Sequence, residues 1–162
     1  MAAIANLSET HFRATPPTGG WSVAQVFEHL CLSGDAYVDR AIPEALERAR
    51  SRGSAGRPYR TSLVGGLLIG AMRESNRHRL PSPKPWRAGP QVRPEVVQHF
   101  LAGVERLGPL LDDAERTDPC TSIASPASAL LRMHLGDAFV ILAEHAHRHL
   151  AQVERTRRAV GG

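Results

Sequence analysis

The sequence lacks the features that mark a membrane-spanning, secreted or thiolate-metal protein. No apolar run approaches the roughly 18–20 residues that a membrane-spanning helix needs. The opening residues, MAAIANLSETHF, have no basic flank followed by an apolar core, so they do not predict a secretory signal. The two cysteines, Cys31 and Cys120, form no metal-spaced pair. We therefore expect a cytoplasmic protein that has free thiols and no membrane partner.

Lysine is almost absent, since Lys84 is the only one, and the net charge of +4 comes mostly from arginine. The basic residues are spread along the chain and mixed with acidic ones, which gives only a weak indication of an anionic partner. The most basic stretch, residues 48–60 (RARSRGSAGRPYR), is not matched by interleaved aromatic residues. A solvated linker is therefore favoured there, and a nucleic-acid partner is not expected.

Strand patterns are missing as well, whereas helical periodicity recurs through most of the chain. The length suits one domain with its own core, spanning residues 1–162. Residues 1–20 form a lead-in with little structure beyond a helical turn, and Pro94 suits the first turn of a later helix. We predict helices over residues 22–48, 61–79, 94–116 and 134–158, an all-α fold that is typical of a helical bundle.

Two local signals bear on these helices. Ser22 is followed three residues later by Gln25, which predicts an S-x-x-Q capping box at the start of the first helix. The second helix contains Gly65, Gly66 and Gly70, each of which weakens it by about 1 kcal/mol against alanine. The same glycines would permit close packing against another helix.

The last predicted helix carries two histidines in its apolar stripe. His145 and His149 are one turn apart, so their side chains lie about 40° apart on one helix face. A buried imidazole needs partners for both ring nitrogens, or its desolvation costs roughly 1–3 kcal/mol. One explanation is a divalent metal beside the helix, since histidines at i and i+4 can both reach it. The other is that both are satisfied core or interface histidines.

A metal site needs a further ligand from elsewhere in the chain. His29 lies at the edge of the first helix's apolar stripe, where it either points into a groove between helices or stays half exposed. Cys31 faces elsewhere. On the last helix, His147 lies on the opposite face and is expected to be solvated. His134 is about 16 Å along the axis from His145, which restricts it to a local role near the helix start.

Two motifs together resemble the DinB-like superfamily of metal-binding four-helix bundles. They are W-S-V-A-Q-V-F-E-H-L at 21–30 and H-A-H-R-H-L-A-Q-V at 145–153. H-L-G at 134–136 resembles the start of the family's last helix, although the proline is absent and the glycine is nearer. The segment PSPKPWRAGP resembles the family's Pro-rich crossover. The resemblance covers most of residues 18–158.

This resemblance implies a four-helix bundle of up-down-down-up topology with a Pro-rich crossover. It also implies a tris-histidine site for a divalent metal, most often Zn²⁺ or Ni²⁺, that keeps an open position for water or substrate. The matching ligands are His29, His145 and His149, with Arg148 and Gln152 in their expected places. Family members with assigned chemistry include thiol-dependent transferases and isomerases. The expected function is therefore a metal-dependent hydrolase or a thiol-dependent S-transferase, with a low-molecular-weight thiol or another small molecule as substrate.

A non-catalytic helical module is the alternative interpretation. Its histidines would be structural or would bind metal for stability alone, and the chain would form a homodimer. The Gly-rich helix at 61–79 and the short lead-in motivate this alternative, since both leave surface to cover. No residue stands out as a general base, and Glu28, Glu144 and His134 are candidates only by their proximity in the sequence.

Overall fold

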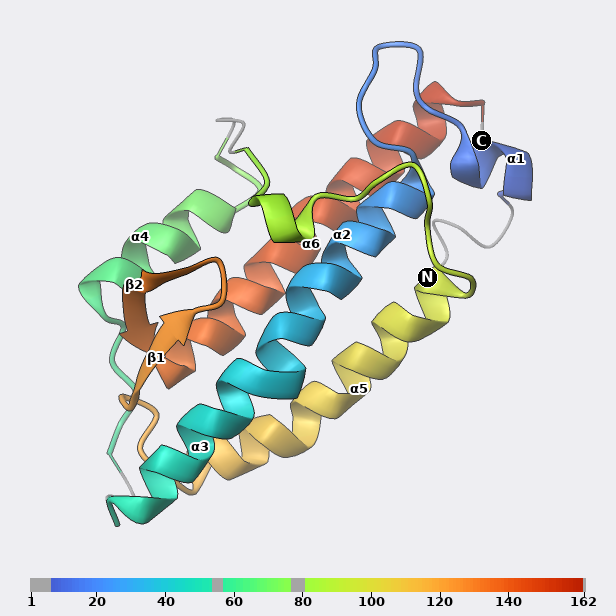
Figure 1. Cartoon of the computed structure of the whole chain (residues 1–162). Helices are drawn as coiled ribbons and strands as arrows, with labels where there is room; N and C mark the ends of the chain where they lie inside the picture. The colour runs from blue at the N-terminus through green and yellow to red at the C-terminus, as the bar shows by residue number, and fades with distance from the viewer. Residues whose placement is uncertain (1–6, 54–56, 77–80, 162) are drawn as a thin grey trace.

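The computed structural model describes residues 7–53, 57–76 and 81–161 and is mostly helical (Figure 1). The end of the second predicted helix, residues 77–79, lies outside the described residues. The elements in chain order are α1 (Glu9–Arg13), α2 (Val23–Asp35), the π-helical segment η2 (Ala36–Ala41), α3 (Ile42–Ser51), α4 (Leu63–Met72), the 3₁₀ turn η3 (Lys84–Trp86), α5 (Val96–Glu115), β1 (Ser122–Ser125), β2 (Ser128–His134) and α6 (Leu135–Ala159). No helix in these described ranges is long and apolar enough to cross a membrane.

The long helices α2, α5 and α6 lie side by side (Figure 1). α2 packs between α5 and α6, and α6 packs between α2 and α4. Beyond η2, α3 continues along the line of α2 and contacts both α5 and α6. The turn η3 of the Pro-rich crossover lies against α2. Side chains that point from α2 and α6 toward each other therefore meet inside the molecule.

The first predicted helix has its expected start but is interrupted by one π turn. Ser22 Oγ accepts a hydrogen bond from the Gln25 N–H at 3.2 Å, and Gln25 Oε1 accepts one from the Ser22 N–H at 3.0 Å, which confirms the capping box. The π segment η2 then separates α2 from α3. Pro43, near the start of α3, has no N–H to donate to the preceding turn, and a π turn can absorb such a break.

The second predicted helix is shorter than expected. α4 begins after Ser62, whose Oγ accepts from the Gly65 N–H at 2.9 Å, and it ends at Met72 because the polar residues that follow (RESN) have no apolar stripe to bury. Close packing is confirmed at Gly65, where an added Cβ would lie 2.0 Å from Asp137 Oδ2. The prediction of close packing is wrong for Gly70, where an added Cβ would meet nothing within 4 Å.

The third predicted helix starts later than expected. α5 begins at Val96, and its N-cap residue Glu95 has a left-handed φ of 51°. Pro94 therefore precedes the cap instead of occupying the first turn. Pro109 lies inside α5 without ending it. By contrast, α6 matches the helix predicted over 134–158 closely, and the lead-in contains the short helix α1.

An antiparallel β-hairpin corrects the all-α expectation. In it β1 pairs with β2 so that Ile123 lies opposite Met133, and both side chains are almost completely buried. They join Leu135 in one core cluster. The segment is rich in serine, alanine and leucine, and it has few of the β-branched and aromatic residues that favour strands. Its alternation is also weak, since Leu130 in β2 is 92 % exposed, so the strands have no clear signature in the sequence.

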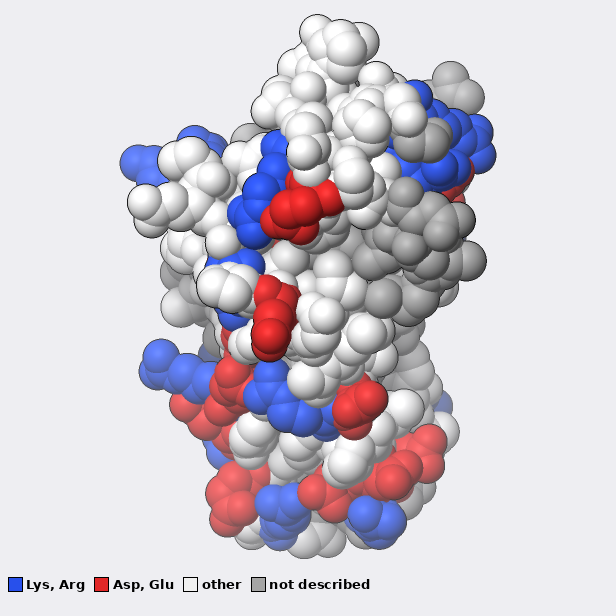
Figure 2. All heavy atoms as spheres, turned by 90° about the vertical axis from the view of Figure 1, so that its right-hand side faces the viewer, with Lys and Arg blue, Asp and Glu red and all other residues white. Residues whose placement is uncertain are grey.

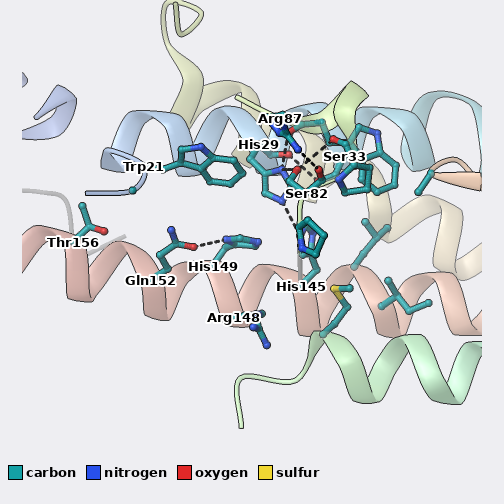
Figure 3. Close-up of a pocket in the computed structure, with 18 of the residues that line it drawn as sticks. Trp21, His29, Ser33, Ser82, Arg87, His145, Arg148, His149, Gln152 and Thr156 are labelled. Carbon is teal, nitrogen blue, oxygen red and sulfur yellow. Dashed lines mark hydrogen bonds between the residues drawn. The ribbon is translucent and has the colours of Figure 1, made fainter. Parts of the chain in front are cut away.

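Two clusters of buried apolar residues flank the middle of α6. One contains Leu135, Ala138 and Ile141 from its first half, together with residues of α3, α4 and the hairpin. The other contains Val153 from its second half and the buried face of α2. Three histidines of α6 lie between Ile141 and Val153, and two of them, His145 and His149, point toward α2 (Figure 3). Polar side chains thus face α2 in the gap between the two cores.

Candidate metal centre

Three histidines from neighbouring helices converge in this gap (Figure 3). His29 is on α2, and His145 and His149 are on α6. One ring nitrogen of each lies within 4.8 Å of the corresponding ring nitrogens of the other two. The three pairs of ring centroids are separated by 4.9, 4.7 and 4.6 Å. The structure therefore brings together all three residues that the sequence motifs singled out.

His29 is oriented by the Pro-rich crossover. It is only 3 % exposed, which corrects the half-exposed alternative. Its Nδ1 lies 2.7 Å from the carbonyl oxygen of Trp86 in η3. Because a carbonyl oxygen can only accept, Nδ1 of the neutral ring carries the proton and donates it, which leaves Nε2 with its lone pair. The crossover thus fixes both the tautomer and the ring orientation of His29.

His149 is oriented by its own helix. Its Nδ1 lies 2.9 Å from Gln152 Oε1, so an N–H at Nδ1 donates to that amide oxygen and Nε2 is left as an acceptor. Trp21 flanks two of the rings, with centroid separations of 4.9 Å to His29 and 6.4 Å to His149. The indole therefore covers one side of the histidine cluster.

The remaining ring, that of His145, faces His29 directly. Their Nε2 atoms are 3.0 Å apart. Since Nε2 of His29 has only a lone pair to offer, either His145 donates a proton to it or both lone pairs are directed at one cation. Tetrahedral ligands at about 2.0–2.1 Å from a metal are about 3.3 Å from each other, so the observed separation is of the size that a shared ion requires.

All three imidazoles are held in the neutral form. Burial is the main cause, and with the neighbouring imidazoles and Arg148 it lowers the pKa of His145 to about 2 and that of His149 to about 4. Burial also lowers the pKa of His29, and the hydrogen bond to Trp86 offsets part of that effect. The neutral imidazole is the form that binds metal, so protons do not compete for these nitrogens at neutral pH.

The histidine cluster lies in the wall of a pocket of about 860 Å³. This volume is typical of a small-molecule site. Figure 3 shows His29 projecting from α2 toward His145 and His149 on α6, with Trp21 beside them. A small molecule in the pocket can therefore reach the histidine nitrogens.

The family comparison agrees with this geometry. A family model described as the DinB superfamily matches residues 1–153. The chain belongs to the DinB superfamily. The matched range contains both histidine motifs of this DinB chain, which confirms the resemblance inferred from them. Comparison with curated proteins and with solved structures found no match.

The residues considered as general bases lie outside the pocket of this DinB protein. Glu28 pairs with Arg93 at 3.0 Å, and Glu144 lies 3.9 Å from Arg73. Neither glutamate is among the described residues that line the pocket, and His134 is not among them either. Proximity in sequence was misleading because consecutive helical residues point about 100° apart.

His134, His147 and Cys31 lie where their spacing predicted. The His134 N–H donates to Asp137 Oδ2 at 2.8 Å at the start of α6, so its role is local. His147 is exposed. Cys31 is buried with its thiol 3.4 Å from the Val96 carbonyl oxygen, and burial raises the pKa of this thiol to about 12. None of the three belongs to the histidine cluster.

Several contributors to the site had no role in the sequence interpretation. Trp86 acts through a backbone carbonyl, which has no sequence signature. Trp21 begins the motif that contains His29, which was a usable signal, but no role at the site was predicted for it. Arg87 lies in the Pro-rich segment and Arg155 lies beyond the last motif, but no pattern in the sequence marks either as a pocket residue, so only the three-dimensional arrangement identifies them.

Proposed function

We propose that this DinB protein is a metal-dependent enzyme, a hydrolase or a thiol-dependent S-transferase, in which His29, His145 and His149 hold a Zn²⁺ or Ni²⁺ ion. The observation that carries the proposal is the convergence of three neutral imidazoles, two of which have their second ring nitrogen hydrogen-bonded. Metal-binding histidines in proteins almost always have such a second partner. A bound ion of this kind supplies Lewis acidity and lowers the pKa of a coordinated water or thiol.

The residues around the histidines support this chemistry in distinct ways. Gln152 and the Trp86 carbonyl hold the rings of His149 and His29 in the tautomer whose Nε2 can bind an ion. Trp21 covers one side of the cluster and limits the access of bulk water to it. The pocket beside the cluster has room for a low-molecular-weight thiol or another small-molecule substrate.

The first test measures the metal content of protein purified without an affinity tag. We expect about one equivalent of transition metal in the wild type and none in His149→Ala. His147→Ala is the matched control, because His147 is on the same helix but exposed. That variant should keep its metal. The same metal content in His149→Ala as in the wild type would refute the proposal.

The second test separates the two reactions. Metal-loaded protein is assayed with p-nitrophenyl acetate for ester hydrolysis, and with glutathione and 1-chloro-2,4-dinitrobenzene for thiol transfer. A rate that persists in His147→Ala and disappears in His149→Ala assigns the corresponding reaction to the metal site. Rates that are equal in the two variants would contradict a role of the histidines in catalysis.

We also infer that α2–α3, α4, α5 and α6 are the four helices of the family's up-down-down-up bundle, with residues 81–90 as the crossover. The packing order α5, α2, α6, α4 supports this inference. We place residues 1–162 in one cytoplasmic domain, supported by the free thiols Cys31 and Cys120. A stable fragment released by limited proteolysis would contradict the single domain.

The second candidate function is a non-catalytic homodimer or interaction module. One observation favours it: Leu63 and Leu67, one turn apart on α4, are 91 % and 76 % exposed, and Leu130 of the adjacent strand β2 is 92 % exposed. Exposed apolar patches are typical of protein–protein interfaces, and these leucines offer apolar surface on two elements that contact each other. In this alternative, any ion at the histidines would serve stability alone.

Light scattering tests the homodimer. Leu67→Glu should convert a dimer to a monomer, whereas Leu111→Glu, at an exposed position of α5, should leave the dimer intact. A monomeric wild type at micromolar concentration would contradict the dimer. Unfolding on chelation, without thiol- or ester-directed activity, would favour the non-catalytic function.

Nucleic acid is not proposed as a partner. Figure 2 shows basic and acidic side chains alternating over the face on the α5 side of the molecule. On that side Arg93 pairs with Glu28 and Asp35, and Arg106 pairs with Asp35 and Asp39. These acidic partners offset the basic charge that a phosphate backbone would need. A salt-sensitive mobility shift with duplex DNA would contradict this view.

A further inference from the structure

We propose that the pocket selects a small organic anion with an apolar body, whose acidic group lies beside the histidine cluster within reach of the arginines of the pocket wall. This inference names the substrate class of the proposed metal enzyme and therefore rests on the proposed function. Its basis is the distribution of charged and apolar residues along the pocket wall.

The charged residues of the pocket wall are of one sign. The chain as a whole has nearly balanced charges, with 20 Lys and Arg against 16 Asp and Glu. Yet the described residues that line the pocket include Arg87, Arg148 and Arg155, and no carboxylate is among them. A concave site with charges of a single sign concentrates ligands of the opposite sign. A divalent ion on neutral histidines would add to the same field.

The arginines divide into one that positions the site and two that can contact a ligand. Arg148 donates to the backbone carbonyls of Ala71, Arg73 and Asn76 at 3.4, 3.0 and 2.7 Å, so its guanidinium joins α6 to the end of α4. In Figure 3 it points away from His29. Arg148 therefore contributes positive charge to the pocket and makes its contacts with the backbone at and just after the end of α4, not with a ligand.

Arg87 and Arg155 are the two exposed arginines of the pocket wall. Arg87 lies on the crossover side of the pocket and donates to the Ser82 carbonyl at 3.3 Å with one nitrogen. Arg155 is six residues beyond His149 on α6, about 9 Å along the axis. Since helical side chains lean toward the helix N-terminus, Arg155 extends back toward the cluster.

The part of the pocket wall formed by α4 and the first half of α6 is apolar. Ile141 and Leu142 lie on α6 one turn before the histidines, and Leu68 and Met72 of α4 face them. The distance from Ile141 to Arg155 along α6 is about 21 Å. Along α6, His145 and His149 lie between this apolar region and Arg155. A ligand with one acidic group and an apolar body fits this polarity, whereas a cationic ligand of the same shape does not.

Calorimetric titration with two matched probes tests the inference. The probes are 4-phenylbutyrate and 4-phenylbutylamine, which share the apolar body and carry opposite charges. Both metal-loaded and metal-free protein are titrated. We expect 4-phenylbutyrate to bind at least about tenfold more tightly than the amine, since one charge-assisted hydrogen bond corresponds to roughly a tenfold change in affinity or more.

The variants Arg87→Gln and Arg155→Gln locate the acidic group. Each should weaken 4-phenylbutyrate binding by about tenfold, with little effect on the amine. Arg158→Gln is the matched control, because Arg158 is an exposed arginine of the same helix that does not line the pocket. It should bind both probes as the wild type does.

The outcomes separate this inference from the metal proposal. Equal binding of the two probes, no binding of either, or affinities that the Arg87 and Arg155 variants leave unchanged would overturn the inference, even in a protein that holds metal. Arginine-dependent selectivity for 4-phenylbutyrate would support it. If that selectivity occurs in a protein that takes up no metal, the anion pocket stands and the proposed metal enzyme fails.

Discussion

Asp137 connects the start of α4 to the start of α6, and its replacement should destabilise the protein strongly. Its carboxylate is fully buried. Oδ2 accepts from Ser62 Oγ at 2.6 Å, from the Ser62 N–H at 3.2 Å and from the His134 N–H at 2.8 Å, and Oδ1 accepts from Tyr59 Oη at 2.7 Å. Ser62 is the N-cap of α4. One side chain thus satisfies donors at the beginnings of two helices.

The expected loss is about 3 kcal/mol for Asp137→Asn. An asparagine keeps the shape but replaces one acceptor oxygen by a donor, and it removes the charge that strengthens the remaining bonds. Hydrogen bonds to a charged group contribute about 1.5–3 kcal/mol, and they are not additive when they share one acceptor group. Asp112→Asn, at an exposed position of α5, is the control and should change stability by less than about 0.5 kcal/mol.

The effect should depend on pH. Burial alone would raise the pKa of Asp137, but the hydrogen bonds from Ser62 and Tyr59 and from backbone N–H groups outweigh it and place the pKa below its ordinary value. Folding therefore favours the ionised form. The stabilisation that ionised Asp137 gives to the folded protein is fully present above the pKa of about 3.9 that an aspartate has in the unfolded chain. It is lost as the pH falls through the lower pKa of Asp137 in the folded protein.

Urea unfolding followed by circular dichroism measures both predictions. The difference in unfolding free energy between wild type and Asp137→Asn should be constant between about pH 5 and pH 7 and should shrink below about pH 4. A loss of less than about 1 kcal/mol at neutral pH would refute the assignment of Asp137 as the shared acceptor. A difference that grows in acid would refute the sign of its pKa shift.

Three further substitutions test the packing of α4 and the histidine cluster. Gly65→Ala should destabilise the protein by about 2 kcal/mol or more, because the added Cβ would overlap Asp137. Gly70→Ala has open space around its Cβ and should stabilise α4 by up to about 1 kcal/mol. Equal urea midpoints for the two variants would contradict this prediction. Gln152→Leu removes the partner of His149 Nδ1 and should weaken metal binding about 10–100-fold in a chelator competition, with saturating stoichiometry unchanged. An unaltered affinity would mean that Gln152 does not orient the ring.

Features encoded by neighbouring residues could be predicted from the sequence. The Ser22–Gln25 capping box needs only residues three apart, and α6 has a long periodic stripe. The pair His145 and His149 follows from helical spacing alone. His29 required the family motif, because its periodicity placed it at the edge of a stripe while the crossover actually buries it.

Features that depend on distant partners could not be predicted. The hairpin exists because Ile123 and Met133 pair across it and enter a core built by other helices. The carbonyl of Trp86 acts on His29 from 57 positions away, and no side-chain pattern records a backbone acceptor. The role of Asp137 likewise has no local signature, because its partner Ser62 is 75 residues away in the sequence.

The separation of His29 and His145 along the chain gives the histidine cluster a mechanical meaning. These residues are 116 positions apart, and α3, α4, α5 and the hairpin all lie between them. An ion held by both would be a reversible cross-link that closes most of the chain into one loop. A disulfide closing a loop of about 100 residues restricts the unfolded chain by about 4.7 kcal/mol in the chain-entropy model. A chelator would then act on this fold as a reductant acts on a disulfide-linked one, and the Tm would rise with metal concentration.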